Sequence, residues 1–258
     1  MREIISLFYF ALAYKKIVYM KFLLTNDDGY NADGILLLRD KLAKYGDVTI
    51  VAPFEHMSAK SASVTLGNWI KVDRIDENTY AVHGTPTDCA SMAIVGLKLD
   101  CDIFVSGCNN GPNLSYDILL SGTVGACFGA MVLKKKTVAF SAPFGDFSCL
   151  AEHFDEIWNF IIEHNLLNDR YCLNINLPKG EYKGIKISRC YYRNDYYYYD
   201  QKDGDLYFAL RDIEDFEKMP EDADCRLVKE GYVSISPISR LPFNEEQYQE
   251  VLKKVQTK

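Results

Sequence analysis

The stretch Lys21-Phe-Leu-Leu-Thr-Asn-Asp-Asp-Gly29 decides the fold class of this chain. Apolar residues fill positions 17–24, interrupted only by Lys21, and the run stops at Asn26-Asp-Asp-Gly29. An apolar run that ends in turn residues predicts a buried strand followed by a loop. Ligands of open α/β sheets bind at the carboxyl ends of the strands, so this loop is the first candidate for a functional site.

Asp27 and Asp28 are adjacent carboxylates at this predicted strand end. Two neighbouring carboxylates repel each other and lose hydration energy unless a cation lies between them. Asp-Asp-Gly is also ordinary turn chemistry. The motif alone therefore fits both a metal site and a solvated turn.

The residues that follow alternate between helical and strand patterns. Residues 34–45 have helical periodicity, with Asp33 as candidate N-cap and Gly46 as the stop, and residues 48–52 form the next strand. Strand, helix and strand in this order predict a βαβ unit and a mostly parallel sheet in an α/β fold. Further expected strands are 62–66, 69–74, 79–83, 102–106, 137–141 and 231–237, and further expected helices are 89–98, 123–133, 147–165 and 244–254.

The alternation of predicted helices and strands ends near residue 183. Residues 191–199 contain six tyrosines, and Lys202-Asp-Gly-Asp205 is a hairpin turn signal with a return strand at 205–210. An isolated hairpin is marginally stable in water, so its aromatic content predicts packing on another subunit, with folding back onto its own domain as the alternative. We expect a core at 20–183 and, at 184–258, an oligomerisation arm with the last strand and a terminal helix.

Residues 1–19 are expected to be an extension that precedes a start at Met20. The apolar stretch at 4–14 is too short to span a bilayer, and Met20 directly precedes the first core strand. A short native helix that docks on the domain is the alternative.

The composition excludes several classes of protein. The chain has 258 residues, 48% of them hydrophobic and 25% charged, with a net charge of −7. That charge argues against a nucleic-acid surface, so a nucleic-acid duplex is not an expected partner. A membrane is not an expected partner either, because the apolar stretch at 4–14 is too short to span one. The eight cysteines form no Cys-x-x-Cys pair and are expected to be buried free thiols of a cytoplasmic protein.

Two further loops follow predicted strands and carry oxygen ligands. One is the serine-rich stretch 52–63, and the other is Ser106-Gly-Cys-Asn-Asn-Gly-Pro-Asn113, which continues to Ser121-Gly-Thr123 at a helix start. Carboxylates, hydroxyls and amide oxygens together suit Mg²⁺ or Mn²⁺, and a helix start suits an anion. Each piece alone is also an ordinary loop or helix cap. A cation site beside an anion site suggests phosphate chemistry.

The order of these motifs resembles the SurE family of survival-protein nucleotidases. The matching segments are Thr25-Asn-Asp-Asp-Gly29, Ala52-Pro53 with Ser58 and Ser61, Gly84-Thr-Pro-Thr-Asp-Cys89, Ser106-Gly-Cys-Asn-Asn-Gly-Pro-Asn113 and Ser121-Gly-Thr-Val124, with weaker matches at Ser188-Arg-Cys190, Arg193 and 230–237. The resemblance implies a Rossmann-like three-layer fold and a metal-dependent phosphatase acting on nucleoside 5′- or 3′-monophosphates. It also implies a homodimer or homotetramer built by exchanged C-terminal segments.

The resemblance assigns roles to individual residues. It implies that one Mg²⁺ or Mn²⁺ ion is held by Asp27, Asp28, Ser58 and Asn109, and that the phosphate is bound by Asn113, Ser121, Gly122 and Thr123. Asp27 and Asp28 are also the candidate catalytic residues.

The chain departs from the family pattern at Ala62, Ser115, Leu120 and Phe54-Glu-His56. These departures leave the implied metal ligands intact and bear on base or sugar preference and on turnover.

Three other interpretations compete with this one, and the simplest of them is a purely structural oligomer without a ligand. A haloacid-dehalogenase-type phosphatase requires Asp-x-Asp after the first strand, whereas the position two after Asp27 is Gly29. A nucleotide-binding sensor without catalysis requires the same binding residues, and a phosphate-release assay separates it from the enzyme.

Overall fold

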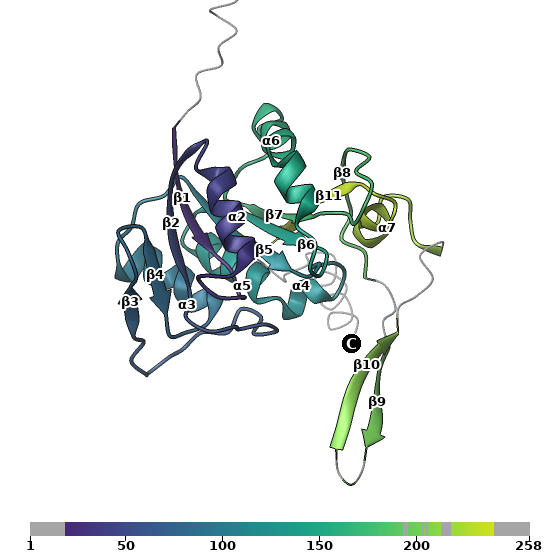
Figure 1. The fold of residues 1–258 in the computed structure, drawn as a ribbon, viewed down its shortest axis with the longest axis horizontal. Helices are drawn as coiled ribbons and strands as arrows, with labels where there is room; N and C mark the ends of the chain where they lie inside the picture. Colours follow the sequence, from purple (N-terminus) through teal and green to yellow (C-terminus); the bar gives the residue numbers. More distant parts are fainter. Residues whose placement is uncertain (1–18, 193–195, 203, 205, 213–217, 240–258) are drawn as a thin grey trace, which may run out of the picture.

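A nine-stranded sheet forms the centre of the computed structural model, which describes residues 19–192, 196–202, 204, 206–212 and 218–239 (Figure 1). The strand order is β3-β4-β2-β1-β5-β6-β7-β11-β8. The six strands from β4 to β7 are parallel, whereas β3 and β11 run antiparallel to β4 and β7. The strands are β1 (Met20–Thr25), β2 (Gly46–Pro53), β3 (Val72–Arg74), β4 (Thr79–Val82), β5 (Ile103–Asn110), β6 (Lys136–Ala142), β7 (Tyr171–Asn176), β8 (Ile185–Ile187) and β11 (Val233–Ser239).

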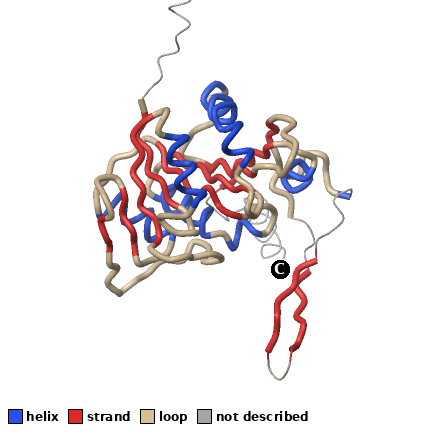
Figure 2. The backbone as a smooth tube through the Cα atoms, in the orientation of Figure 1, coloured by secondary structure: helices blue, strands red, loops and turns tan. Residues whose placement is uncertain are grey.

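Helices cover both faces of the sheet, which gives the predicted three-layer α/β fold (Figure 2). On one face, α2 (Asp33–Leu42) and α6 (Ser148–Glu163) pack against Phe22 and Leu24 of β1. On the other face, α3 (Pro86–Ser91) and α5 (Gly122–Val132) pack around Leu23. Neighbouring residues of a strand point to opposite faces, so the consecutive apolar residues 22–24 of β1 contribute to both layers.

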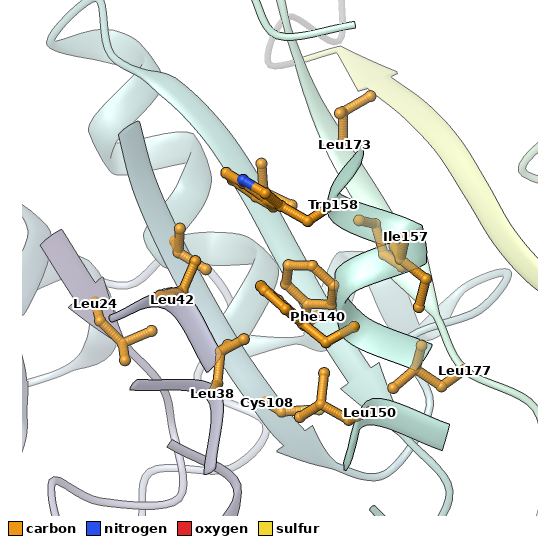
Figure 3. Packing of buried hydrophobic residues seen from close by; sticks show 14 of the residues in the cluster. Leu24, Leu38, Leu42, Cys108, Phe140, Leu150, Ile157, Trp158, Leu173 and Leu177 are labelled. Atoms are coloured by element: carbon orange, nitrogen blue, oxygen red, sulfur yellow. The ribbon is translucent and has the colours of Figure 1, made fainter. Parts of the chain in front are cut away.

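The larger core lies under α6. Apolar residues recur along this helix at three- and four-residue spacing, so one face of it is buried (Figure 3). Trp158 stacks on Phe154 at a centroid distance of 5.9 Å and meets Phe22 of β1 edge-on at 5.6 Å. Burial of one such side chain stabilises the fold by roughly 1.5–3 kcal/mol.

The first βαβ unit is confirmed as β1, α2 and β2, with β1 and β2 parallel. Two details differ from the prediction. Ala32, not Asp33, is the N-cap of α2, and Asp33 lies in the first turn. Gly46 is the first residue of β2, where a Cβ atom would lie 1.8 Å from the carbonyl oxygen of Met20. That glycine is required by the close approach of two strands.

Other elements differ from the predictions in position or kind. Residues 62–66 form a loop and no strand, and of 69–74 only β3 is a strand. The helix expected at 89–98 begins at Pro86 with Thr85 as its cap and continues as a π-helical turn, Met92–Gly96. The expectation missed β7, β8 and two short helices, α4 (Asp117–Leu120) and α7 (Asp224–Lys229). Polar residues interrupt the apolar pattern in these four segments, and tertiary packing fixes them.

The predicted hairpin is present as β9 (Tyr196–Lys202) and β10 (Leu206–Asp212), which pair antiparallel as a sheet of their own. It extends away from the nine-stranded sheet (Figure 1). The expected terminal helix at 244–254 lies outside the described residues. All eight cysteines are free thiols, and all except the half-buried Cys190 are buried. Every helix in the described part of the chain is too short or too polar to span a bilayer.

Candidate active site

The loop after β1 is closed by Asn26. The side-chain amide of this buried residue donates to the carbonyl oxygen of Gly29 at 2.8 Å, and the Gly29 N–H donates back to Asn26 Oδ1 at 3.2 Å. Gly29 has φ of 115°, a conformation that favours glycine. This closed turn fixes the backbone conformation of Asp27 and Asp28. The two carboxylates are the first components of the candidate site.

Asp27 is joined directly to the start of α5. The Thr123 hydroxyl donates to Asp27 Oδ1 at 2.5 Å. A Cβ atom on Gly122 would lie 2.9 Å from Asp27 Cβ and 3.0 Å from Asp27 Oδ2. Only glycine therefore lets the helix start come this close to the carboxylate.

Burial dominates the electrostatics of Asp27, which is 3% exposed. Loss of hydration raises the pKa of Asp27 to about 6; the hydrogen bond from Thr123 lowers it, and the charge of Asp28 raises it. A carboxylate held in this way favours a cation that would offset its lost hydration.

Asp28 is tied to the loop after β5. The backbone N–H of Asn110 donates to Asp28 Oδ2 at 3.0 Å, and His56 Nδ1 lies 3.4 Å from Asp28 Oδ1. The neighbouring Asn109 uses its amide nitrogen to donate to the Gly111 carbonyl oxygen at 2.8 Å. The amide oxygen of Asn109 thus remains as its possible metal ligand.

A backbone hydrogen bond connects the loop of Ser58 to the loop of the aspartates. The N–H of Met57 donates to the carbonyl oxygen of Asp27 at 2.7 Å, and Ser58 is the next, exposed residue. The same loop is held over α4 and α5, because Ser61 donates from its N–H to the Leu120 carbonyl oxygen at 3.0 Å. The loop that carries Ser58 is therefore held against the loop of the aspartates, although the two are far apart in sequence.

The N-terminus of α5 is capped by a side chain. Ser121 is the N-cap, and its hydroxyl oxygen accepts from the N–H of Val124 at 3.1 Å. The first N–H groups of a helix have no partner within the helix, so those of Gly122 and Thr123 suit an anion. Capping and phosphate binding are compatible here, since a hydroxyl that accepts one hydrogen bond can donate another.

Asn113 lies in a buried amide network instead of contacting the aspartates. Its side chain donates to Ser141 Oγ at 2.8 Å, and its backbone N–H donates to Asn176 Oδ1 at 2.7 Å. The side-chain amide of Asn174 donates to the carbonyl oxygen of Asn113 at 2.9 Å. Asn174 and Asn176 are not among the predicted site residues, although asparagines alternate with apolar residues at the end of the segment Tyr171–Asn176 and so give a sequence signal.

The ligand set fits a hard cation. Across the described residues, no group of three or more His, Cys, Asp or Glu side chains is arranged to hold a metal. A metal here would draw on the two aspartates and on the neutral oxygens of Ser58 and Asn109, an all-oxygen set that suits Mg²⁺ or Mn²⁺.

Known proteins resemble this chain in sequence and fold. Residues 22–196 match the family model described as survival protein SurE. The 5′-nucleotidase SurE of Thermosipho melanesiensis is 38% identical over 245 residues, which cover 88% of this chain and 94% of that protein. The 5′-nucleotidase SurE of Mannheimia succiniciproducens is 37% identical over 228 residues, covering 85% and 92%. The crystal structure of the SurE protein from Aquifex aeolicus matches with a TM-score of 0.78 and 32% identity, over 92% of this chain and 99% of that one. The chain therefore belongs to the survival protein SurE family.

Proposed function

We propose that this chain is a metal-dependent 5′-nucleotidase, which hydrolyses nucleoside 5′-monophosphates to nucleoside and phosphate. One observation carries the proposal: the 2.5 Å hydrogen bond from Thr123 to Asp27 joins a carboxylate pair to an anion-binding helix start. A phosphate bound at α5 would therefore lie beside the cation site. Family membership supports the same activity, since the relatives are named 5′-nucleotidases. Nucleoside 3′-monophosphates are further candidate substrates.

Asp27, Asp28, Ser58 and Asn109 would hold one Mg²⁺ or Mn²⁺ ion. Such an ion polarises a phosphoryl oxygen and lowers the pKa of water. The two aspartates supply the negative charge, and the neutral oxygens complete the set.

The protein's own groups bind and orient the phosphate. The N–H groups of Gly122 and Thr123 donate to phosphoryl oxygens, and the positive end of the α5 dipole stabilises the charge that develops on them. Ser121 donates from its hydroxyl while it caps the helix, and Asn113 supports the loop through the amide network. One aspartate orients the attacking water and accepts its proton.

The test is phosphate release from a panel of nucleoside 5′- and 3′-monophosphates, measured with Mn²⁺, with Mg²⁺ and with a chelator. We expect release that depends on the metal. Nucleotide binding without release in any of these conditions identifies the sensor instead. A haloacid-dehalogenase-type mechanism is excluded by family membership and by Gly29, which stands where that class carries its second aspartate.

We further propose that residues 184–258 assemble the chain into a homodimer or homotetramer. The hairpin of β9 and β10 supports this, because its two strands pair only with each other among the described strands. A lone hairpin is marginally stable in water. Deletion of residues 196–212 is expected to reduce the number of subunits per particle in light scattering, and an unchanged number contradicts the proposal. Residues 20–183 form the catalytic part, and a chain that begins at Met20 is expected to keep activity.

A further inference from the structure

Three aromatic rings form a stack at the same edge of the sheet as the aspartate pair. Tyr30 follows β1, Phe54 follows β2 and His83 follows β4, and these strands are neighbours in the sheet. The ring centroids of Phe54 and His83 are 4.3 Å apart with planes at 18°, and those of Tyr30 and Phe54 are 6.0 Å apart at 28°. We call these three residues the ring stack.

Hydrogen bonds hold the ring stack in place before any ligand binds. The Tyr30 N–H donates to the Pro53 carbonyl oxygen at 2.9 Å, and the Phe54 N–H donates to the Val82 carbonyl oxygen at 2.8 Å. The His83 ring is fixed through Nε2, which lies 2.8 Å from Asp73 Oδ2. A surface that is ordered in advance binds a flat ligand with little entropic cost.

The ring stack is partly open to solvent at Phe54. Phe54 is 39% exposed. The His83 ring lies close to the Phe54 ring, whereas the Tyr30 ring lies farther from it and is more tilted, so part of the Phe54 ring is left uncovered. Single exposed aromatic residues are common on protein surfaces, but an exposed ring in a fixed stack beside a polar site is a binding feature.

The chain fixes the separation between the ring stack and the aspartates. Tyr30 lies two residues after Asp28, and Phe54 lies two residues before His56, which contacts Asp28 at 3.4 Å. Two residues span at most about 7 Å between Cα atoms. The ribose of a nucleoside monophosphate bridges a comparable separation between its phosphate and its base.

We propose that Phe54 and Tyr30 bind the nucleobase of the substrate by stacking and thereby set base preference. The base lies on the exposed part of the Phe54 ring, next to Tyr30, while the phosphate lies at the start of α5. Purines are favoured over pyrimidines because their larger rings cover more of the aromatic surface. This inference rests on the proposed nucleotidase activity and names the residues that select its substrate.

The test compares kcat/KM for AMP, UMP and ribose 5-phosphate in the wild type, in Phe54→Ala and in Trp69→Ala. Trp69 is fully exposed and serves as the matched control outside the ring stack. Phe54→Ala is expected to lower kcat/KM for AMP about tenfold, mainly through KM, because one base–aromatic stack is lost. Ribose 5-phosphate has no base, so its hydrolysis is expected to stay unchanged. Trp69→Ala is expected to match the wild type, and Phe54→Trp to restore AMP turnover.

Equal losses for AMP and ribose 5-phosphate overturn the inference, as does an unchanged AMP value in Phe54→Ala. If Phe54→Ala does not fold, Phe54→Leu keeps the apolar side chain without a π face and gives the same comparison. Binding of adenosine, measured by calorimetry on the wild type and on Phe54→Ala, tests the base site without depending on phosphatase activity. A wild type without phosphatase activity refutes the function, whereas adenosine binding that Phe54→Ala fails to weaken refutes the ring stack as the base site.

Discussion

The Thr123 hydroxyl donates to Asp27 Oδ1 over 2.5 Å and so joins the start of α5 to the end of β1 across 96 residues of sequence. Both residues are buried, and the hydrogen bond to a charged acceptor is of the strong kind. It places a helix N-terminus and a carboxylate pair in one site, and the first prediction tests that pair.

Asp27→Asn and Asp28→Asn are each expected to abolish metal-dependent phosphate release while the fold is kept. Asn preserves the shape and one acceptor oxygen but removes the charge that would hold the ion. Thermal melts with and without Mn²⁺ check the cause. Saturating metal at about 100 times Kd stabilises a protein by about 2.7 kcal/mol, and the variants are expected to lose most of this gain.

Asp100→Asn is the matched control for the aspartate pair, since Asp100 is an exposed carboxylate paired with Lys21 at 3.1 Å. It is expected to keep both turnover and the gain from Mn²⁺. Near-wild-type turnover in either site variant would show that the Asp pair is only a turn.

The raised pKa of Asp27 predicts that the metal-free protein becomes less stable toward unfolding as the pH rises. The folded state holds the Asp27 proton up to about pH 6, whereas the unfolded chain releases it near the ordinary value of 3.8. The folded state thus binds more protons in this window, and the free energy of unfolding falls as pH rises from about 4 to about 6. At neutral pH the free energy of unfolding is lower by about 3 kcal/mol than it would be with an unshifted Asp27.

Asp27→Asn removes this titration, so the comparison needs urea unfolding of both proteins without metal at several pH values. The variant is expected to match the wild type near pH 4 and to exceed its stability above pH 6. A stability difference that is constant with pH contradicts the raised pKa.

Gly122→Ala is expected to reduce turnover by about 10- to 100-fold, because the new Cβ atom displaces the Asp27 carboxylate. Gly129→Ala is the control in the same helix. A Cβ there would lie 2.8 Å from Thr87 Cγ2, away from the aspartates. This control is expected to change the melting temperature and to leave kcat unchanged. Similar kcat losses in both variants would mean that helix packing, not Asp27 placement, limits turnover.

Asp224→Ala is expected to destabilise the fold by about 2–4 kcal/mol, because it removes a buried carboxylate that accepts three backbone hydrogen bonds. The buried Asp224 carboxylate accepts from the N–H groups of Ser115, Tyr191 and Cys225 at 3.2, 3.3 and 2.8 Å. It therefore joins α7, the loop before α4 and the segment that leads to the hairpin.

Asp222→Ala is the control for Asp224→Ala. Asp222 is a half-exposed carboxylate whose ion pair with Arg189, at 3.0 Å, lies at the surface. Urea unfolding is expected to show a change below about 1 kcal/mol for Asp222→Ala. Equal effects of the two substitutions would contradict a structural role of the Asp224 carboxylate.

The sequence alone determined the elements whose signals are local. The apolar run before Asn26 specified a buried strand, the periodicity of α2 and α6 specified their apolar faces, and the motif order specified the family. Such signals lie within a few residues of the chain, since side-chain periodicity is set by backbone geometry.

The tertiary structure decided what depends on contacts between distant segments. The pairing of β11 with β7, the hydrogen bonds that join Asn113 to Asn174 and Asn176, and the ring stack of Tyr30, Phe54 and His83 each connect segments that are distant in the sequence. The loop that carries Ser58 is likewise held next to the aspartate loop by the Met57 N–H, which donates to the Asp27 carbonyl oxygen. Strand order and loop placement are fixed by the whole core packing at once, and no single segment of the sequence contains that information.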